Sequence, residues 1–213
     1  MVGAEAGRSG AADVEVDGRT ARRDRNRVAV LDAVLELFAE GELRPSPDEV
    51  ARRSGVSLRS VYRYVADADD LLRSAIERHL EKVEPLFVID DIGSGPFEHR
   101  LDRFLDARLR VYEAIAATAR ASRLVAPRSE VIREQQDRGR RLMRTQLQRQ
   151  FASELDLLES ATRDGVVAAA DALTQMETIE LYRHHRRCSP ARTRDLLQVA
   201  LRGLLTGAYR PES

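Results

Sequence analysis

Apolar residues recur at helical spacing along most of this chain, and no segment alternates apolar and polar positions long enough to predict a strand. A first amphipathic run covers 28–38 and is followed by Gly41, the residue type that commonly ends a helix. A second run covers 67–83 and stops before Pro85. We expect both runs to form helices. The inward positions of the first run are Val28, Leu31, Val34, Leu35 and Phe38.

Two short helices are predicted between these runs. Ser46 is a good N-cap, Pro47 suits the first helical position, and Glu49 completes a capping box. Gly55 ends this helix after about two turns, and Ser57 caps the next helix. Two short helices that are joined by a tight turn containing glycine form a helix-turn-helix.

A loop over 89–96 contains glycine and proline and precedes a second helical region. The last helix of that region opens with Ser189 as N-cap and Pro190 at its first position. The sequence therefore predicts an all-α fold, in which an N-terminal three-helix domain with the helix-turn-helix precedes a C-terminal helical bundle. The expected parts are a disordered tail over 1–20, the helix-turn-helix domain over 21–84, a linker over 85–96 and the C-terminal domain over 97–213.

Composition agrees with helices but does not itself indicate a partner. Hydrophobic residues make up 43% of the 213 residues and aromatic residues 5%, which suits a core of Leu, Val and Ala. Lys82 is the only lysine among 35 basic residues, so the other 34 are arginines. They are matched by 35 acids, which gives a formal net charge of zero. The position of the arginines, rather than their number, must carry any argument for nucleic-acid binding.

Cysteine usage and the apolar runs bear on the compartment. Cys188 is the only cysteine, so no internal disulfide can form and a reducing compartment is the default. No apolar run approaches the roughly 18 residues of a membrane span. The first residues lack the basic and apolar segments of a signal peptide. We therefore expect a cytoplasmic protein that does not associate with membranes.

Positive charge is concentrated in the helix-turn-helix, where no acid occurs from Val50 to Ala66. With Val61 directed to the core, the outer face of the second short helix carries Arg59 and Arg63. A helix that presents arginines outward can enter a major groove and read guanine. The alternative is an amphipathic hairpin whose arginines are merely solvated, and the absence of acids argues against it.

Residues 27 to 83 resemble the DNA-binding domain of the tetracycline-repressor (TetR) family of transcription regulators, over about a quarter of the chain. The matching residues are Arg27, Leu31, the LFAEG motif at 37–41, Val50-Ala51, Gly55-Val56-Ser57, Val61-Tyr62, Tyr64 and the DDLL motif at 69–72. The resemblance implies that Arg59 contacts bases, that Ser60, Tyr62 and Tyr64 contact phosphates, and that Arg63 does either. The full predicted set of DNA-binding residues is Arg27, Ser57, Leu58, Arg59, Ser60, Tyr62, Arg63 and Tyr64.

The chain departs from the family pattern in three places, one of which is the link after Gly41, which is about one residue short and contains two prolines. Val65 stands where the family usually has phenylalanine. Ala68 stands where the family usually has a lysine that contacts phosphate. The segment 19–27, with five arginines and one acid, is a candidate replacement for that contact.

The resemblance also implies a protein that binds a palindromic DNA operator as a homodimer, most commonly as a repressor that responds to a small-molecule effector. The sequence does not exclude activation. Two recognition helices about 34–36 Å apart read a palindrome, whereas one alone touches too few bases. We place the interface on the last two long helices, although their apolar rows could instead be internal core. The predicted dimerisation residues are Val166, Ala170, Leu173, Leu197, Leu201 and Leu204.

By resemblance, the other C-terminal helices enclose an effector pocket. Its predicted lining residues are Phe104, Arg108, Tyr112, Met143, Phe151 and Met176. No cofactor or metal is expected, because adjacent His184 and His185 on a helix point in different directions. The chain has no recognisable nucleophile motif or dinucleotide fingerprint, so we do not expect an enzyme. A helix-turn-helix or architectural protein without an effector is the alternative, but roughly 120 residues after the linker exceed what DNA docking requires.

Overall fold

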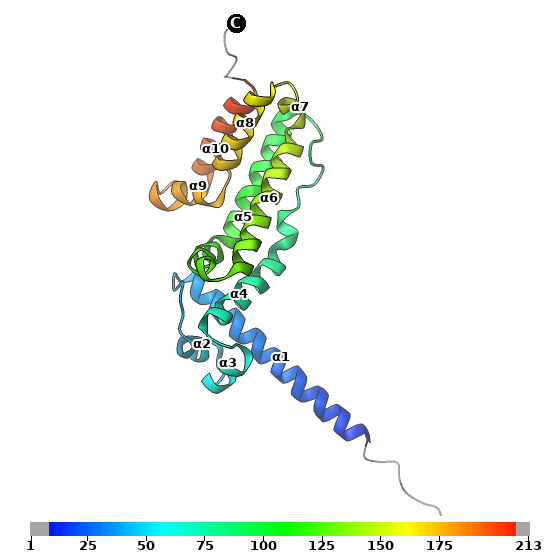
Figure 1. The fold of residues 1–213 in the computed structure, drawn as a ribbon, viewed down its shortest axis with the longest axis vertical. Helices are drawn as coiled ribbons and strands as arrows, with labels where there is room; N and C mark the ends of the chain where they lie inside the picture. Colours follow the sequence, from blue (N-terminus) through cyan, green and yellow to red (C-terminus); the bar gives the residue numbers. More distant parts are fainter. Residues whose placement is uncertain (1–8, 208–213) are drawn as a thin grey trace, which may run out of the picture. The chain divides into compact units, whose positions relative to one another are not determined.

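The computed structural model describes the backbone of residues 9–207 and the side chains of residues 20–207 (Figure 1). All secondary-structure elements assigned within that part of the chain are helices, which confirms the all-α fold. The chain divides into two compact units, Met1–Arg78 and His79–Ser213.

The first unit holds three helices and the start of a fourth. These are α1 (Ser9–Ala39), α2 (Pro47–Ser54), α3 (Leu58–Tyr64) and α4 (Ala68–Val83). Helix α1 begins within the segment 1–20 that we expected to be a disordered tail, because no proline interrupts the chain between Ser9 and Ala39. Residues 1–8 of that predicted tail lie outside the described part of the chain.

The core of the first unit joins all four helices. Val28 is 37% exposed, so the buried stripe of α1 begins at Val30 rather than where the periodicity suggested. The packing of α1 against α2 and α3 encloses apolar side chains that leave almost no exposed surface. They include Val30, Val34, Phe38, Val50, Val61 and Leu71.

Local sequence sets the geometry of the helix-turn-helix. The predicted capping box is confirmed, since the Glu49 N–H donates to Ser46 Oγ (3.3 Å) and the Ser46 N–H donates to Glu49 Oε2 (2.8 Å). Gly55 has φ of 68°, a left-handed conformation that glycine adopts without strain. The Ser57 hydroxyl then caps α3 by accepting from the Ser60 N–H at 3.3 Å.

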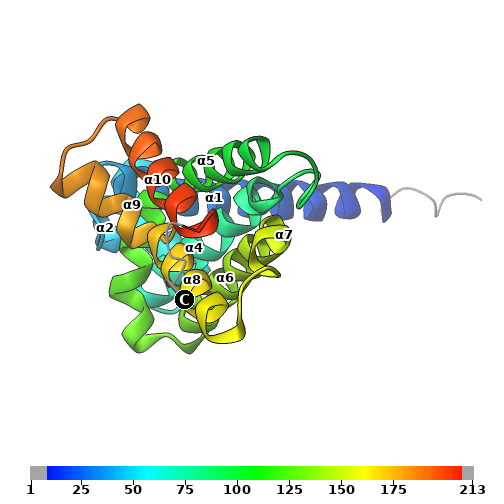
Figure 2. The same ribbon diagram turned by 90° about the horizontal axis from the view of Figure 1, so that it is seen from above.

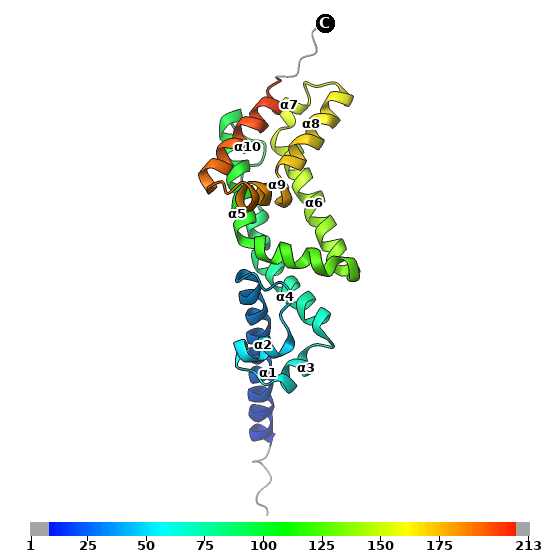
Figure 3. The same ribbon diagram turned by 90° about the vertical axis from the view of Figure 1, so that its left-hand side faces the viewer.

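The second unit is a helical bundle. It contains a 3₁₀ turn over Glu84–Phe87, α5 (Phe97–Val125), a 3₁₀ turn over Ala126–Arg128, α6 (Glu130–Gln150), α7 (Ala152–Leu155), α8 (Ser160–Leu173), α9 (Met176–Glu180), a π-helical turn over Leu181–His185 and α10 (Pro190–Leu205). Helix α5 packs against α6, α9 and α10, and α8 packs against α6 and α10 (Figures 2 and 3). Phe151 separates α6 from α7, and Thr174-Gln175 separate α8 from α9.

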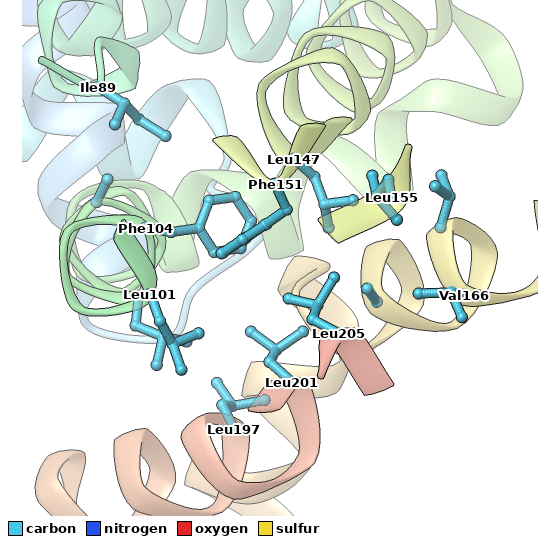
Figure 4. Packing of buried hydrophobic residues seen from close by; sticks show 14 of the residues in the cluster. Ile89, Leu101, Phe104, Leu147, Phe151, Leu155, Val166, Leu197, Leu201 and Leu205 are labelled. Carbon is cyan, nitrogen blue, oxygen red and sulfur yellow. The ribbon is translucent and has the colours of Figure 1, made fainter. Parts of the chain in front are cut away.

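Apolar side chains from these helices meet in one core, in which Phe104 and Phe151 lie close together (Figure 4). Their rings pack edge to face with centroids 5.2 Å apart. Leu197 and Leu201 of α10 are completely buried in the same cluster. This core gives the second unit a hydrophobic interior of its own.

The chain passes from the first unit to the second within α4, between Arg78 and His79, and not in the predicted linker over 85–96. The end of α4 belongs to the second unit because Val83 packs against Val111 and Ile115. Ile89, inside the predicted linker, is itself buried in the core of the second unit. The glycines of that segment identify a loop correctly, but the loop packs as part of the bundle.

The buried ion pair between Arg100 and Glu154 stabilises the bundle. Arg100 Nη2 lies 2.5 Å from Glu154 Oε1, and Arg100 Nη1 donates to the Gln150 carbonyl at 2.7 Å. We expect Arg100→Met to lower the free energy of unfolding by about 3 kcal/mol, because it leaves a poorly solvated carboxylate without its partner. The measurement is urea denaturation. The control is Arg202→Met, which removes a solvent-exposed pair with Glu98 and should cost much less. Equal destabilisation by the two changes would show that the Arg100 pair is no stronger than a surface pair.

Candidate nucleic-acid interface

Helix α3 presents one exposed polar face. Val61 is completely buried, whereas Arg59, Tyr62 and Arg63 are exposed, Tyr62 by 53%. Leu58 and Ser60 are half-buried at the edge of this face. The structure thus separates a core side from a basic, hydroxyl-bearing side over the two turns of α3, as the sequence predicts.

The arginines of the helix-turn-helix are not equivalent. Arg53 pairs with Glu40, the residue that follows α1, at 2.7 Å and with Glu36 of α1 at 3.5 Å. The hydrogen bond from Arg53 holds the pKa of Glu40 below its ordinary value. Arg59, by contrast, forms no hydrogen bond or ion pair with any described residue. The acid-free stretch therefore contains one arginine that a distant acid neutralises and another whose donors all face solvent.

The neighbours of Arg59 differ in how well they are placed for a phosphate. The guanidinium of Arg63 lies 5.6 Å from the ring centre of Tyr64. The Tyr64 hydroxyl is buried and has no hydrogen-bond partner among the described residues, so it cannot reach a phosphate in this conformation. The Tyr62 side chain is exposed, so its hydroxyl is accessible to a phosphate. Ser57, exposed, uses its hydroxyl to cap α3.

Hydrogen bonds to and from Asp70 close the turn between α3 and α4. Asp70 Oδ2 accepts a hydrogen bond from the Ala66 N–H at 2.8 Å, and the Asp70 N–H donates to Asp67 Oδ1 at 2.8 Å. The Ala66 hydrogen bond keeps the pKa of Asp70 below its ordinary value, and Arg73 and the exposed Arg27 contribute in the same direction. Arg27 thus adds positive charge beside this turn.

Four of the six predicted dimerisation residues lie in the interior of the protomer. Ala170, Leu197 and Leu201 are completely buried in the core of the second unit and offer a partner no side-chain surface, whereas Val166 keeps 8% of its surface exposed. Leu173 and Leu204 are partly buried against the same core. The outer face of these helices is apolar as well, with Val199 69% exposed. That face is a shallow groove lined by Ala161, Thr162, Gly165, Val166, Val199, Ala200, Gly203 and Leu204.

The residues predicted to line an effector pocket gather around the core of the second unit. The Arg108 guanidinium lies 4.4 Å from the ring centre of Phe104 and donates to the Met143 carbonyl at 2.6 Å. Tyr112 and Phe151 belong to the same buried cluster, and Met176 packs against it. The residues that the sequence predicts for the pocket are therefore neighbours in the structure, and all lie on the inner side of the bundle.

Three further observations concern the described residues. No group of three His, Cys, Asp or Glu side chains among them is arranged to hold a metal ion. His184 is occupied by a contact of 3.3 Å between its Nε2 and Arg120 Nη1. No helix in the described part of the chain combines the length and apolar character that a membrane crossing requires.

Comparison with known proteins gives a structural relative. No protein-family model matches the chain, and no curated protein matches it in sequence. Among solved structures, the fold is similar to the "Clostridium perfringens putative fatty acid metabolism regulator", with a TM-score of 0.55 and 17% sequence identity. The similarity covers 86% of this chain and 100% of that chain. At this identity the comparison supports the fold.

Proposed function

We propose that this protein is a DNA-binding transcription regulator of the TetR type. The observation that carries the proposal is the exposed face of α3, on which Arg59 has no partner among the described residues while Tyr62 and Arg63 stand beside it. Ser46 caps α2 and Ser57 caps α3, so the helix that would enter the groove is already formed in the free protein. The similarity to a protein described as a regulator agrees with this function.

In the proposed complex, α3 lies in the major groove of operator DNA. Arg59 donates two hydrogen bonds to O6 and N7 of a guanine, which selects that base. Tyr62 donates to a phosphate and positions the helix without reading sequence. Arg53, held by Glu40, stays on the protein and orients α2 against α1.

Binding of duplex DNA is the direct test. Fluorescence anisotropy with the full-length protein should show that labelled duplex fragments bind with an affinity that falls steeply as salt rises, because arginine–phosphate contacts release counterions. Weak, salt-independent binding would contradict the proposal.

We further propose that the protein acts as a homodimer through the apolar groove of α8 and α10. The small residues Gly165, Ala200 and Gly203 allow two helix pairs to approach closely, and the large exposed surface of Val199 is then covered. Two helices from each protomer would form a four-helix bundle. This interface uses the outer faces of the helices that the sequence suggested, while Leu197 and Leu201 stabilise the protomer.

We propose that the basic segment 19–27 contacts DNA phosphates. It would replace the contact made in the family by a lysine at the position that Ala68 occupies in this chain. Arg22, Arg23 and Arg25 are exposed, and deletion of residues 1 to 26 leaves the core residues from Val30 onward intact. We expect the deletion to reduce the slope of log K against log salt by about 0.9 for each phosphate that the segment neutralises. Anisotropy titrations at several salt concentrations measure the slope. An unchanged slope would mean that the segment does not touch DNA.

Finally, we propose that the second unit senses a small molecule and that the protein is a ligand-responsive repressor. An effector must prefer the arrangement in which the recognition helices do not match the operator. Typical couplings of about 1–3 kcal/mol weaken operator binding roughly 5–150-fold, and operator must weaken effector binding by the same factor.

A further inference from the structure

Arg108 of α5 is a buried cation without a counter-ion among the described residues. It is only 2% exposed. Its Nη1 donates to Gln146 Oε1 at 2.7 Å and its Nη2 donates to the Met143 carbonyl at 2.6 Å. Both acceptors are uncharged, and Nε has no partner in the described part of the chain. The side chain is therefore held in place by α6 while part of its hydrogen-bonding edge is unused.

Arg100, two turns earlier on the same helix, is a buried arginine that does have a counter-ion. It is nearly as buried, at 4% exposure, but its guanidinium pairs with the Glu154 carboxylate. No carboxylate of a described residue lies within ion-pair distance of Arg108. Because a buried charge is stable only when it is paired, the fold retains at Arg108 a charge that its own residues do not neutralise.

Asp171, whose charge acts on Arg108, does not remove this imbalance. Burial lowers the pKa of the Arg108 guanidinium to about 10, and the charge of Asp171 acts in the opposite direction. Arg108 thus remains protonated at neutral pH. Asp171 is engaged elsewhere, since Arg144 Nε lies 3.0 Å from its Oδ2 and Gln175 donates to its Oδ1 at 2.8 Å.

A second unused donor lies one turn along α5. Tyr112 is 3% exposed, and its buried hydroxyl has no hydrogen-bond partner among the described residues. Residues four apart lie on one face of a helix, so Tyr112 and Arg108 share a face. Burial raises the pKa of Tyr112, so its hydroxyl stays a donor at neutral pH.

The surroundings define what kind of anion would fit. The Phe104 ring lies against the Arg108 guanidinium, and Phe151 and Leu147 continue the apolar surface (Figure 4). One buried positive charge neutralises one negative charge, whereas a doubly charged phosphate would leave an excess charge in an apolar interior. A planar carboxylate also matches the edge of a guanidinium. The chemistry therefore favours a monocarboxylate with an apolar body.

Helix α6 borders this interior, since Gln146 and the Met143 carbonyl accept the hydrogen bonds of Arg108. Between Ile132 and Met143 it buries no side chain, and Gly139 lies in the middle of that stretch. This part of α6 is held by few apolar contacts, which is typical of segments that open locally. The same helix supplies Met143 and Gln146, the acceptors that a bound carboxylate would supplement or replace.

We propose that Arg108 and Tyr112 bind the carboxylate of an organic monoanion, whose apolar body enters the core beside Phe104. That this molecule is the effector rests on the proposed regulatory function; the binding site itself does not. Arg108 is then a ligand-binding residue, and α6 is the element that moves to admit the ligand.

The test uses the full-length protein and two pairs of probes, decanoate with decanamide and 2-naphthoate with 2-naphthamide. Isothermal titration calorimetry should show at least one acid binding about tenfold or more tightly than its amide, because a hydrogen-bonded charge pair is replaced by a neutral contact. Arg108→Met should abolish this preference, and Tyr112→Phe should weaken the acid severalfold. Arg202→Met, the same change on the surface, should leave it unaltered.

Three results would overturn the proposal: no acid binds the unaltered protein, acid and amide bind equally, or Arg108→Met keeps the preference. If Arg108→Met does not fold, the acid–amide comparison on the unaltered protein and the Tyr112→Phe variant decide. Operator anisotropy in the presence of the acid separates this proposal from the regulatory one. DNA binding without acid preference leaves the regulator standing, and acid binding without DNA release leaves only the site.

Discussion

Gly203→Glu should convert the protein from a dimer to a monomer without unfolding the protomer. A Cβ added at Gly203 meets no atom within 4 Å, so the fold accommodates the new side chain. In the proposed dimer, however, the glutamate enters the apolar groove between α8 and α10, and twofold symmetry places a second copy there. At about 2 kcal/mol or more for each buried charge, the dimer weakens roughly 1,000-fold.

Sedimentation velocity at micromolar concentration measures this change, and circular dichroism checks that the helices remain. Gly139→Glu is the matched control. It places the same side chain on a helical glycine of α6 with no atom within 4 Å of the new Cβ, and the dimer should persist. A Gly203→Glu protein that is still dimeric would exclude this groove as the interface. A monomeric unaltered protein would exclude the dimer altogether.

The second large effect is expected from Arg59→Ala. Removal of a bidentate contact to guanine should weaken operator binding by about 1–3 kcal/mol in each half-site and relax the preference at one base position. Competition between the operator and variants substituted at each base measures both effects. No described residue competes for the Arg59 guanidinium, so the change in affinity reports on DNA alone.

Two variants separate base reading from general attraction to DNA. Arg52→Ala removes the same charge from an exposed position of α2 and should leave base preference unchanged. Tyr62→Phe should weaken binding to all sequences evenly, because a phosphate contact carries no base information. An Arg59→Ala protein that retains full selectivity would show that α3 does not read the groove as proposed.

The helix-turn-helix could be predicted because its determinants are local. Ser46, Glu49, Gly55 and Ser57 act within three residues of their partners, and the structure shows each in its expected role. Arg53 could not be interpreted in the same way. Its two acids are Glu36 of α1 and Glu40, which follows α1, so a stretch without acids in sequence is not a stretch without acids in space.

The C-terminal helices were harder to interpret because two of them are apolar on both sides. In α10, Leu197 and Leu201 face the core while Val199 faces outward. Periodicity identifies both rows but does not say which row packs inside the protomer. The boundary between the two units inside α4 could not be predicted from periodicity either. The apolar stripe of α4 is continuous, although its first part packs in the first unit and its last part packs in the second.

The most direct measurement of the central claim is selection of duplex DNA from a random pool by the full-length protein. A dimer that reads DNA through α3 should enrich a palindrome whose half-sites are centred about one helical turn, or a multiple of it, apart, each with a guanine read by Arg59. Enrichment of an asymmetric site would contradict the dimer. A pool that remains random after repeated rounds would contradict sequence-specific DNA binding by α3.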